Sequence, residues 1–463
     1  MQLNLKNNSP QEAATAYFLL GDIYLYGISK GRPKYEEALY YYEEAHNQSF
    51  GAASLRLAIM YEDGLGIVPA DKQRIAELYE NAGCTGYASA CLLLGEMYQA
   101  HASVPQDYER AIALYEKAAA RKNSEALSNL GMLHYAGIGV PKDYVKAAKL
   151  LEEAAAQSHP PSQVSLGAML HEGIGIFRDY KRAAELFEKA AAVEHPGGQY
   201  YLGLMYQRGT WVPQDYRKAL ELIEKAAAQG LAEAKNYLGL LYEKGELVPQ
   251  DSNKALEYYE EAAAQGEADA QFNLGVSYMM GKGMSQDYTK AAELFAEAAK
   301  QGLATAQFNL GVMYRLGQGV PQDNKKALEL FEEAAAQGVA IAQFNVGMMY
   351  MLGEGGPPDD NKAIKLFRKA VFQGEAAAVN ALGWMYELGR GVEKDEGKAV
   401  SYYKKAANQN CACGILNLAY CLEHGIGIAV DTMRAADLYA SIDDATKLEW
   451  RQARGLENST ASS

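Results

Sequence analysis

A Leu-Gly dipeptide, or a close variant of it, recurs along this chain at a constant spacing of 36 residues. Its second residue stands at Gly95, Gly131, Gly167, Gly203, Gly239, Gly275, Gly311, Gly347, Gly383 and Ala419. Two steps of 37 residues extend the series back to Ala58 and Gly21. A period of this length, repeated twelve times, predicts a solenoid of stacked helical units. We call this place the reference position and number other positions by their offset from it.

Each repeat shows the pattern of two helices joined by a short turn. In the ninth repeat, Ala306, Leu310 and Tyr314 lie at helical spacing and predict a first helix, helix A. Glycines and a proline then interrupt the pattern, because proline cannot continue a helix. A second apolar stripe predicts helix B and consists of Ala327, Leu330, Phe331 and Ala334. The chain is therefore expected to be all-α, with about 24 helices.

An aspartate precedes helix B in almost every repeat. It stands at offset +12 in ten consecutive repeats, from Asp107 to Asp431, and Asp71 lies one residue later in the second repeat. An aspartate at this place accepts hydrogen bonds from the free N–H groups of the first helical turn. These carboxylates are therefore predicted to cap helices rather than to bind metal.

Small and bulky residues recur where the two helices of a repeat must meet. Offset +16 is alanine from Ala111 to Ala435, and offset +20 is often aromatic, as at Phe331. Such a pair predicts knob-and-hole packing between helices A and B. A tyrosine at offset +3, such as Tyr314, occurs in nine of the twelve repeats and is also predicted to belong to the core.

Composition argues against several classes of function. The net charge of −14 and the lack of any basic run argue against nucleic-acid binding, which requires clustered Lys and Arg. No window approaches the roughly 20 apolar residues of a membrane span, so we expect no membrane insertion. The N-terminus does not show the pattern of a secretory signal peptide. We expect a cytoplasmic protein, with a bacterial effector exported by another route as the alternative.

The sequence shows no pattern typical of a catalytic or metal site. Its G-x-G stretches lack a preceding strand and the G-K-[ST] ending of a phosphate-binding loop. The group of Cys411, Cys413 and Cys421 has no second pair that would complete a zinc site. The seven histidines stand at unrelated offsets, with no Ser-His or Cys-His grouping. We therefore expect no enzyme activity, no metal and no cofactor.

Together these motifs resemble those of a known family. The pattern A-x-A-Q-F-N-L-G-V-M-Y, then G-x-G-V-P-Q-D, K-A-x-E-L-F and A-A-x-Q-G, is similar to the Sel-one-like repeat, a relative of the tetratricopeptide repeat. The resemblance covers about residues 13–442. It implies a right-handed superhelical α/α solenoid and a role as an adaptor or scaffold for protein complexes.

The chain is predicted to have three parts. Residues 1–12 form an N-terminal extension, residues 13–442 hold the twelve repeats as one solenoid, and residues 443–463 form a capping helix and a disordered tail. Leu448 and Trp450 are expected to cover the exposed core of the last repeat, because terminal repeats need such caps.

Helix A has a second face, formed by offsets −6, −2, +1 and +5, with −3 and +4 beside it. In the resembled folds this face lines a concave groove, which twelve hairpins about 8–10 Å apart would extend to about 100 Å. Asn273, Asn309 and Asn345 occupy offset −2 in three successive repeats. Either their amides bond both N–H and C=O of an extended partner, or they bond only water or their own helix.

Several larger side chains lie beside these asparagines. Met279, Arg315 and Met351 stand at offset +4 and either form an adaptable binding surface or pack between adjacent repeats. Trp384, at offset +1, is the strongest single candidate for a binding hot spot. Three phenylalanines at offset −3 are predicted to be structural: Phe272, Phe308 and Phe344.

These features predict a non-enzymatic scaffold or adaptor that binds a partner peptide or domain in the concave groove. The alternative is a regulatory subunit that docks an enzyme on its outer face. Competition by a short linear peptide separates the two hypotheses, because only groove binding would be blocked.

Overall fold

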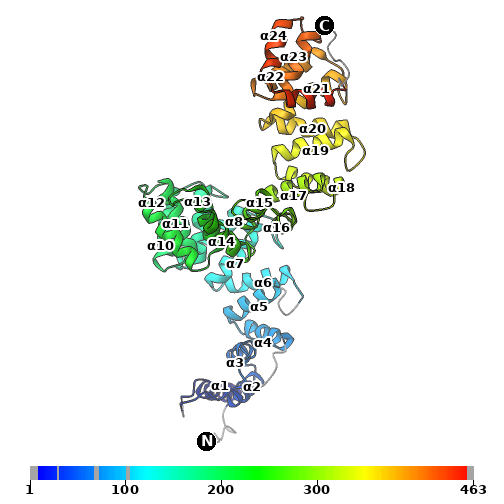
Figure 1. Ribbon diagram of the computed structural model, residues 1–463. Helices are drawn as coiled ribbons and strands as arrows, with labels where there is room; N and C mark the ends of the chain where they lie inside the picture. Colours follow the sequence, from blue (N-terminus) through cyan, green and yellow to red (C-terminus); the bar gives the residue numbers. More distant parts are fainter. Residues whose placement is uncertain (1–8, 29–30, 67–71, 101–104, 456–463) are drawn as a thin grey trace. The chain divides into compact units, whose positions relative to one another are not determined.

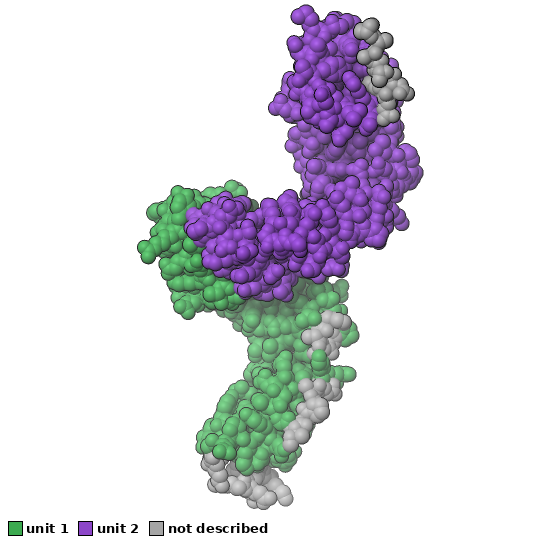
Figure 2. Space-filling model, viewed as in Figure 1, with its two compact units in different colours: residues 1–234 green, residues 235–463 purple. Residues whose placement is uncertain are grey.

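The computed structural model describes residues 9–28, 31–66, 72–100 and 105–455. Within these residues the chain forms 25 α-helices and no strand (Figure 1). The prediction of an all-α solenoid is confirmed, since 24 helices form hairpins and one more follows them. The chain divides into two compact units, residues 1–234 and 235–463 (Figure 2).

In both units, helices A carry odd numbers and helices B carry even numbers. The helices of the first unit are α1 (Pro10–Leu25), α2 (Tyr35–His46), α3 (Gly51–Glu62), α4 (Lys72–Cys84), α5 (Ala88–Ala100), α6 (Tyr108–Ala119), α7 (Ser124–Ala136), α8 (Tyr144–Ala156), α9 (Pro160–Glu172), α10 (Tyr180–Ala192), α11 (Pro196–Arg208) and α12 (Tyr216–Ala228). Helix α1 begins at Pro10, where Ser9 and Glu12 form a capping box. Residues 10–12 of the predicted extension therefore belong to this helix.

The second unit takes in most of α13 (Ala232–Lys244), whose first residues precede the division. Its further helices are α14 (Ser252–Ala263), α15 (Ala268–Met280), α16 (Tyr288–Lys300), α17 (Ala304–Leu316), α18 (Asn324–Ala336), α19 (Ala340–Leu352), α20 (Asp360–Phe372), α21 (Ala376–Leu388), α22 (Glu396–Asn408), α23 (Ala412–His424), α24 (Thr432–Ala440) and α25 (Asp444–Ala453). The predicted tail from residue 456 onward and Asp71 lie outside the described residues.

The turn between helices A and B is closed by hydrogen bonds that recur from repeat to repeat. Helix α17 ends at Gly317, whose positive φ of 68° is the left-handed conformation that favours glycine. The Asp323 backbone N–H then donates to the Tyr314 carbonyl oxygen at 2.9 Å. Its carboxylate accepts from the Lys325 and Lys326 backbone N–H groups, both at 3.1 Å. All ten aspartates from Asp107 to Asp431 cap helices, as predicted, and each accepts one or two backbone N–H groups of the first turn.

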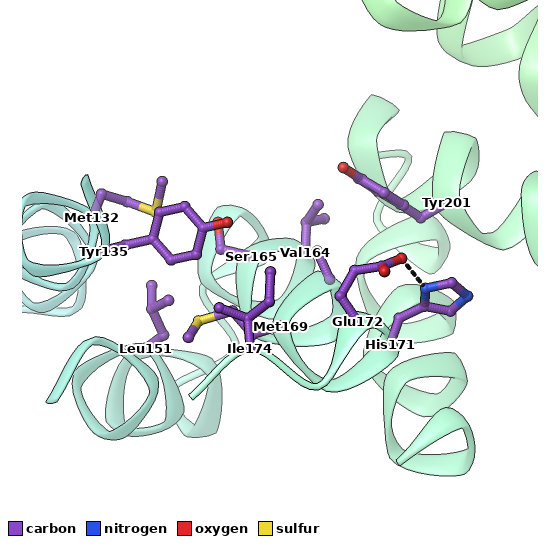
Figure 3. Close-up of a pocket in the computed structure, with 11 residues that line it drawn as sticks. Met132, Tyr135, Leu151, Val164, Ser165, Met169, His171, Glu172, Ile174 and Tyr201 are labelled. Atoms are coloured by element: carbon purple, nitrogen blue, oxygen red, sulfur yellow. Dashed lines mark hydrogen bonds and ion pairs between the residues drawn. The ribbon is translucent and has the colours of Figure 1, made fainter. Parts of the chain in front are cut away.

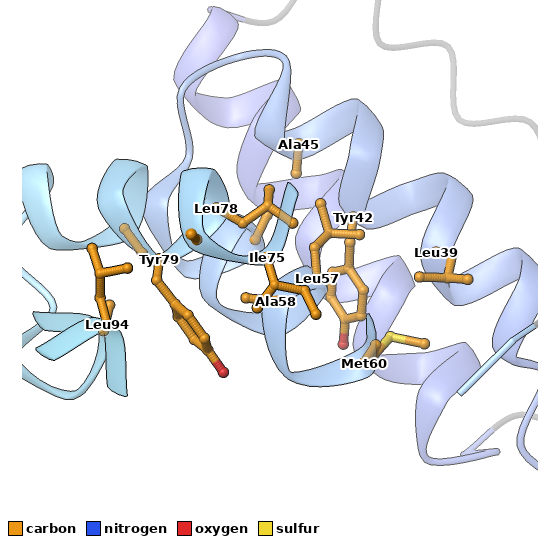
Figure 4. Packing of buried hydrophobic residues seen from close by; sticks show 14 of the residues in the cluster. Leu39, Tyr42, Ala45, Leu57, Ala58, Met60, Ile75, Leu78, Tyr79 and Leu94 are labelled. Atoms are coloured by element: carbon orange, nitrogen blue, oxygen red, sulfur yellow. The ribbon is translucent and has the colours of Figure 1, made fainter. Parts of the chain in front are cut away.

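The reference glycine lets an aromatic ring from helix B pack directly against helix A. A Cβ atom at Gly311 would lie only 2.8 Å from the Phe331 ring, whose side chain is fully buried. Figure 4 shows the same packing in the first unit, where Tyr42 and Tyr79 lie among Leu57 and Leu78. The predicted knob-and-hole packing between helices A and B is found at the bulky residue, but the small residue that faces its ring is the reference glycine and not the buried alanine at offset +16.

The tyrosines at offset +3 need a correction, because they are only partly buried. The inner side of the Tyr314 ring packs against the core, but the Lys326 ammonium lies 5.2 Å from the ring centroid. The same cation–π contact recurs between Lys290 and Tyr278 and between Lys362 and Tyr350. These rings therefore lie at the edge of the core.

Glutamines join successive repeats to one another. Gln307 is almost fully buried, and its side-chain oxygen accepts a hydrogen bond from Gln337 Nε2 at 2.8 Å. Gln337 Nε2 also donates to the Gly302 carbonyl oxygen at 2.9 Å. The contact recurs one repeat earlier, between Gln301 and Gln271. These bonds satisfy buried polar groups and hold the repeats of the second unit in register.

Candidate interaction face

A row of exposed apolar side chains follows helices A of the second unit. Offset +5 is apolar and exposed in four successive repeats: Met280 (56%), Leu316 (59%), Leu352 (48%) and Leu388 (50%). We call these four residues the apolar row. At the same offset the chain carries Glu172, Arg208 and Lys244 before the row and His424 after it. Because water-exposed apolar side chains that line up in this way are unfavourable, such a row is typical of an interaction surface.

The asparagines at offset −2 lie beside the apolar row. Asn309 Nδ2 donates to the Thr305 carbonyl oxygen and Asn345 Nδ2 to the Ile341 carbonyl oxygen, each at 2.8 Å within its own helix. A carbonyl oxygen can only accept, so these two amides are fixed with Oδ1 pointing the other way. Each of the two asparagines thus uses one amide N–H within its own helix, as the own-helix interpretation predicted. Asn309 Oδ1 remains an open acceptor, whereas Asn345 Oδ1 accepts from Arg315.

Two further asparagines at offset −2 direct their amide N–H groups to other asparagines. Asn273 Nδ2 donates to Asn236 Oδ1 at 2.9 Å, and Asn417 Nδ2 donates to Asn380 Oδ1 at 2.8 Å. Asn273 Oδ1 is left to accept, whereas Asn417 Oδ1 already accepts from the Trp450 indole. In the second unit asparagine stands at offset −2 in α15, α17, α19 and α23, and Ala381 occupies this offset in α21.

The three candidates at offset +4 differ from one another. Arg315 is a third exposed and bonds the Glu354 carboxylate at 3.2 Å and Asn345 Oδ1 at 3.3 Å. Met279 is partly buried against the core around α16 and α17. The expectation that Met351 is exposed is wrong: it is 2% exposed, because it packs in one cluster with Ala378 and Leu382 of the next repeat.

Trp384 lies at the edge of a cavity of about 330 Å³ in the second unit. The cavity is lined by Phe344 and Met348 of α19, Trp384 of α21, and Trp450 and Arg454 at the end of the chain. The predicted structural role of Phe272, Phe308 and Phe344 is confirmed. Their rings pair with those of Phe295, Phe331 and Phe367 at 5.6, 5.4 and 6.0 Å.

The last helix, α25, packs on the same face. Trp450 is buried and donates its indole N–H to Asn417 Oδ1 at 2.7 Å. Arg454 forms an ion pair with Glu387 in which both side chains are about nine-tenths buried. The Arg454 guanidinium also lies 4.3 Å from the Tyr420 ring centroid. Leu448, expected to cover the core, is instead 57% exposed, because α25 turns its Trp450 side toward α23.

The first unit has a separate hollow on helices A, which the sequence analysis missed. It has a volume of about 330 Å³ and is lined by Met132 and Tyr135 of α7, Glu172 of α9 and Tyr201 of α11 (Figure 3). Glu172 accepts a hydrogen bond from His171 Nδ1 at 2.7 Å. Alanine stands at offset +1 here, at Ala168, where larger side chains precede and follow it. This exchange of a large residue for a small one is the signal that could have revealed the hollow.

The described residues contain no cluster of three or more His, Cys, Asp or Glu side chains that could hold a metal ion. Across the same residues, no helix combines the length and apolarity that crossing a bilayer requires. All five cysteines lie in the described part and are free thiols.

Comparison with known proteins agrees with the repeats seen in the sequence and the fold. The family model described as the Sel1 repeat matches residues 14–49, 51–84, 88–123, 124–159, 160–195, 196–231, 232–267, 268–303, 304–339, 340–374, 376–411 and 414–441. No curated protein sequence matches significantly.

Two solved structures illustrate the similarity. A protective antigen of uropathogenic Escherichia coli with an SLR fold is 29% identical, with 99% of this chain and 97% of that chain covered and a TM-score of 0.51. A Sel1 repeat protein from Oxalobacter formigenes is 32% identical, with 67% of this chain and 90% of that chain covered and a TM-score of 0.45.

Proposed function

The chain belongs to the Sel1 repeat family, whose members generally mediate protein–protein interactions, and on this premise we propose that it is a non-enzymatic scaffold. Its partner is a protein segment that lies along helices A of the second unit. The proposed contacts are the apolar row together with Asn273, Met279, Asn309, Arg315, Asn345 and Trp384. Met351 is not among them, because its side chain is buried.

The apolar row is the observation that carries this proposal. Four apolar residues at one offset, each about half exposed, place a regular series of apolar side chains in water. Adjacent helices A are separated by about 10 Å, and a segment in the polyproline II conformation advances about 9 Å per turn of three residues, so that every third side chain points to the same side. A partner segment with an apolar side chain at every third residue therefore matches the row.

The asparagines beside the row define the polar chemistry of the same partner. Asn309 and Asn345 each use an Nδ2 hydrogen within their own helix, which turns Oδ1 away from it; Asn309 Oδ1 is an open acceptor, and Asn345 Oδ1 also accepts from Arg315. Backbone N–H groups of an extended segment are the donors that such a row would bind. The apolar row would supply affinity and the asparagines would set the register of the bound segment.

Affinity capture with paired variants tests the proposal. The double variant Leu316→Ser, Leu352→Ser removes the centre of the apolar row without touching buried residues. Phe372→Ser is the matched control, because Phe372 is 93% exposed at the end of helix B α20. We expect wild type and Phe372→Ser to retain the same partner and the double variant to lose it while keeping its helicity.

The control also separates this proposal from docking of an enzyme on the outer face. If Phe372→Ser loses the partner and the double variant keeps it, binding occurs through helices B and the proposal is wrong. If the double variant keeps the partner and Phe372→Ser does as well, the apolar row is not the binding surface.

A further inference from the structure

Helix α25 shows how this solenoid holds a helix on the face formed by helices A. Its Trp450 indole donates to Asn417 at offset −2 of the twelfth repeat, and Arg454, four residues later, pairs with Glu387 at offset +4 of the eleventh. Residues four apart lie on one side of a helix, so a single helix face makes both contacts.

Two more side chains of the solenoid orient the two residues that α25 contacts. Asn380, at offset −3 of the eleventh repeat, accepts the Asn417 Nδ2–H bond and so turns Asn417 Oδ1 toward Trp450. Tyr403, at offset +20, donates its hydroxyl to Glu387 Oε2. The site therefore consists of an oriented amide acceptor and an oriented carboxylate, one repeat apart.

The same four residues recur four repeats earlier in the chain. Asn273 Nδ2 donates to Asn236 Oδ1 at 2.9 Å, and the Tyr259 hydroxyl donates to Glu243 Oε2 at 2.7 Å. Each residue stands 144 positions before its counterpart at the α25 site. Asparagine occurs at offset −3 in no other repeat than these two. We call Asn236, Glu243, Tyr259 and Asn273 the second amide–carboxylate site.

The second amide–carboxylate site is open where the α25 site is covered. Glu243 is 29% exposed whereas Glu387 is 12% exposed. Glu243 and Tyr259 also line a cavity of about 520 Å³, which Asn236 and Asn273 do not line. Asn273 Oδ1 accepts no hydrogen bond from any described residue. Burial alone would raise the pKa of Glu243, but hydrogen bonds from Tyr259 and Lys282 hold that pKa below its usual value. The site therefore presents an unbonded acceptor and an ionised carboxylate.

We propose that the second amide–carboxylate site binds a helix of a partner protein that carries a tryptophan and, four residues later, an arginine. This inference rests on the proposed function, because it assigns one anchor of the same partner-binding face. The indole N–H would donate to Asn273 Oδ1, and the guanidinium would pair with Glu243 beside Lys282. Lys282 is 52% exposed, so water weakens its 3.0 Å ion pair with Glu243 and a second cation can share the carboxylate.

One difference lowers the affinity expected at this site. Tyr420, which covers the Arg454 guanidinium at the α25 site, is replaced by Val276 at the second site. A partner arginine would therefore lose that cation–π contact and keep only its ion pair. Binding by an isolated short helix is expected to be weak but saturable.

A labelled peptide of residues 443–455 is the probe for this test, used with the full-length chain. Fluorescence anisotropy should show saturable binding with one peptide per chain. Glu243→Gln and Asn273→Ala should each weaken binding about tenfold or more, because each removes one partner of an oriented pair. Replacing Arg454 of the peptide by alanine should have the same effect. Asn129→Ala is the matched control, since Asn129 has the same offset in the first unit, donates to Glu96 instead of an asparagine, and is not among the proposed contacts.

Two results would overturn the inference. If Glu387→Gln weakens peptide binding and Glu243→Gln does not, the peptide only exchanges with α25 at its own site. If no saturable binding occurs up to about 1 mM peptide, the second site does not accept this chemistry. Neither result depends on the apolar row, so capture of a partner through Leu316 and Leu352 can still succeed or fail on its own.

Discussion

Asp323 shows how much a single side chain contributes to the free energy of unfolding when its contacts lie within one turn of the chain. Its carboxylate accepts two backbone N–H bonds at the start of α18, and no other side chain of the turn replaces them. Asp323→Ala should therefore lower the free energy of unfolding by about 1 kcal/mol. Asp323→Ser retains an acceptor at the cap and should lower it by much less. Urea denaturation followed by circular dichroism measures both, and equal losses in the two variants would contradict a capping role.

Local roles of this kind could be predicted from the sequence, whereas burial at the variable offsets could not. The capping aspartates and the Gly311–Phe331 pair depend only on residues within one repeat. Met279 and Met351 share an offset, yet only Met351 is enclosed, because its surroundings come from the next repeat. The orientation of Asn309 likewise depends on a backbone carbonyl oxygen that carries no sequence signal.

At the scale of one element, α25 is held mainly by Arg454 and Trp450. Arg454→Ala would leave the Glu387 carboxylate nearly buried without its cation, which is unfavourable by several kcal/mol. We expect α25 to detach rather than the solenoid to unfold. Hydrogen–deuterium exchange should then rise in residues 444–455 and stay unchanged in α19 and α21. Arg451→Ala, at an exposed position of the same helix, is the control. Unchanged exchange in α25 of the Arg454→Ala variant would contradict this account.

The place of α25 could be only partly predicted. Its existence, the burial of Trp450 and a contact with the last repeat follow from an amphipathic pattern, but the pattern did not reveal the contact with Glu387 of the eleventh repeat. The signal was present in the two asparagines at offset −3, Asn236 and Asn380, where most repeats carry an aromatic or aliphatic residue. Only the hydrogen bonds to Asn273 and Asn417 show what these two residues do.

At the scale of the whole molecule, the two units should respond differently to acid. Burial is the largest cause that lowers the pKa of four histidines in the first unit: His46, His134, His159 and His195. The folded chain resists their protonation, so the unfolded chain binds more protons below about pH 6.5. Stability of the first unit should therefore fall as the pH drops from 6.5, by at most about 1.4 kcal/mol per pH unit for each histidine.

Hydrogen exchange at pH 7.0 and 5.5, corrected for intrinsic rates, measures this effect in each unit of the same molecule. Exchange should rise more in α3 to α11 than in α15 to α23. His134→Tyr should reduce the difference, because His134 is buried and tyrosine occupies its offset in nine repeats. Burial and the nearby Glu125 raise the pKa of Glu96. Protonation of Glu96 at lower pH therefore favours the folded state and opposes the effect of the histidines on stability. An equal response of both units would contradict the account.

The central claim, that a partner covers helices A of the second unit, is tested most directly by oxidative footprinting of the chain alone and with its captured partner. Met280, Leu316, Leu352 and Leu388 should be protected in the complex. Phe372 and Met433 are 93% and 82% exposed away from the apolar row and serve as internal references that should not change. Protection of Phe372 without protection of the apolar row would contradict the claim and place the partner on helices B.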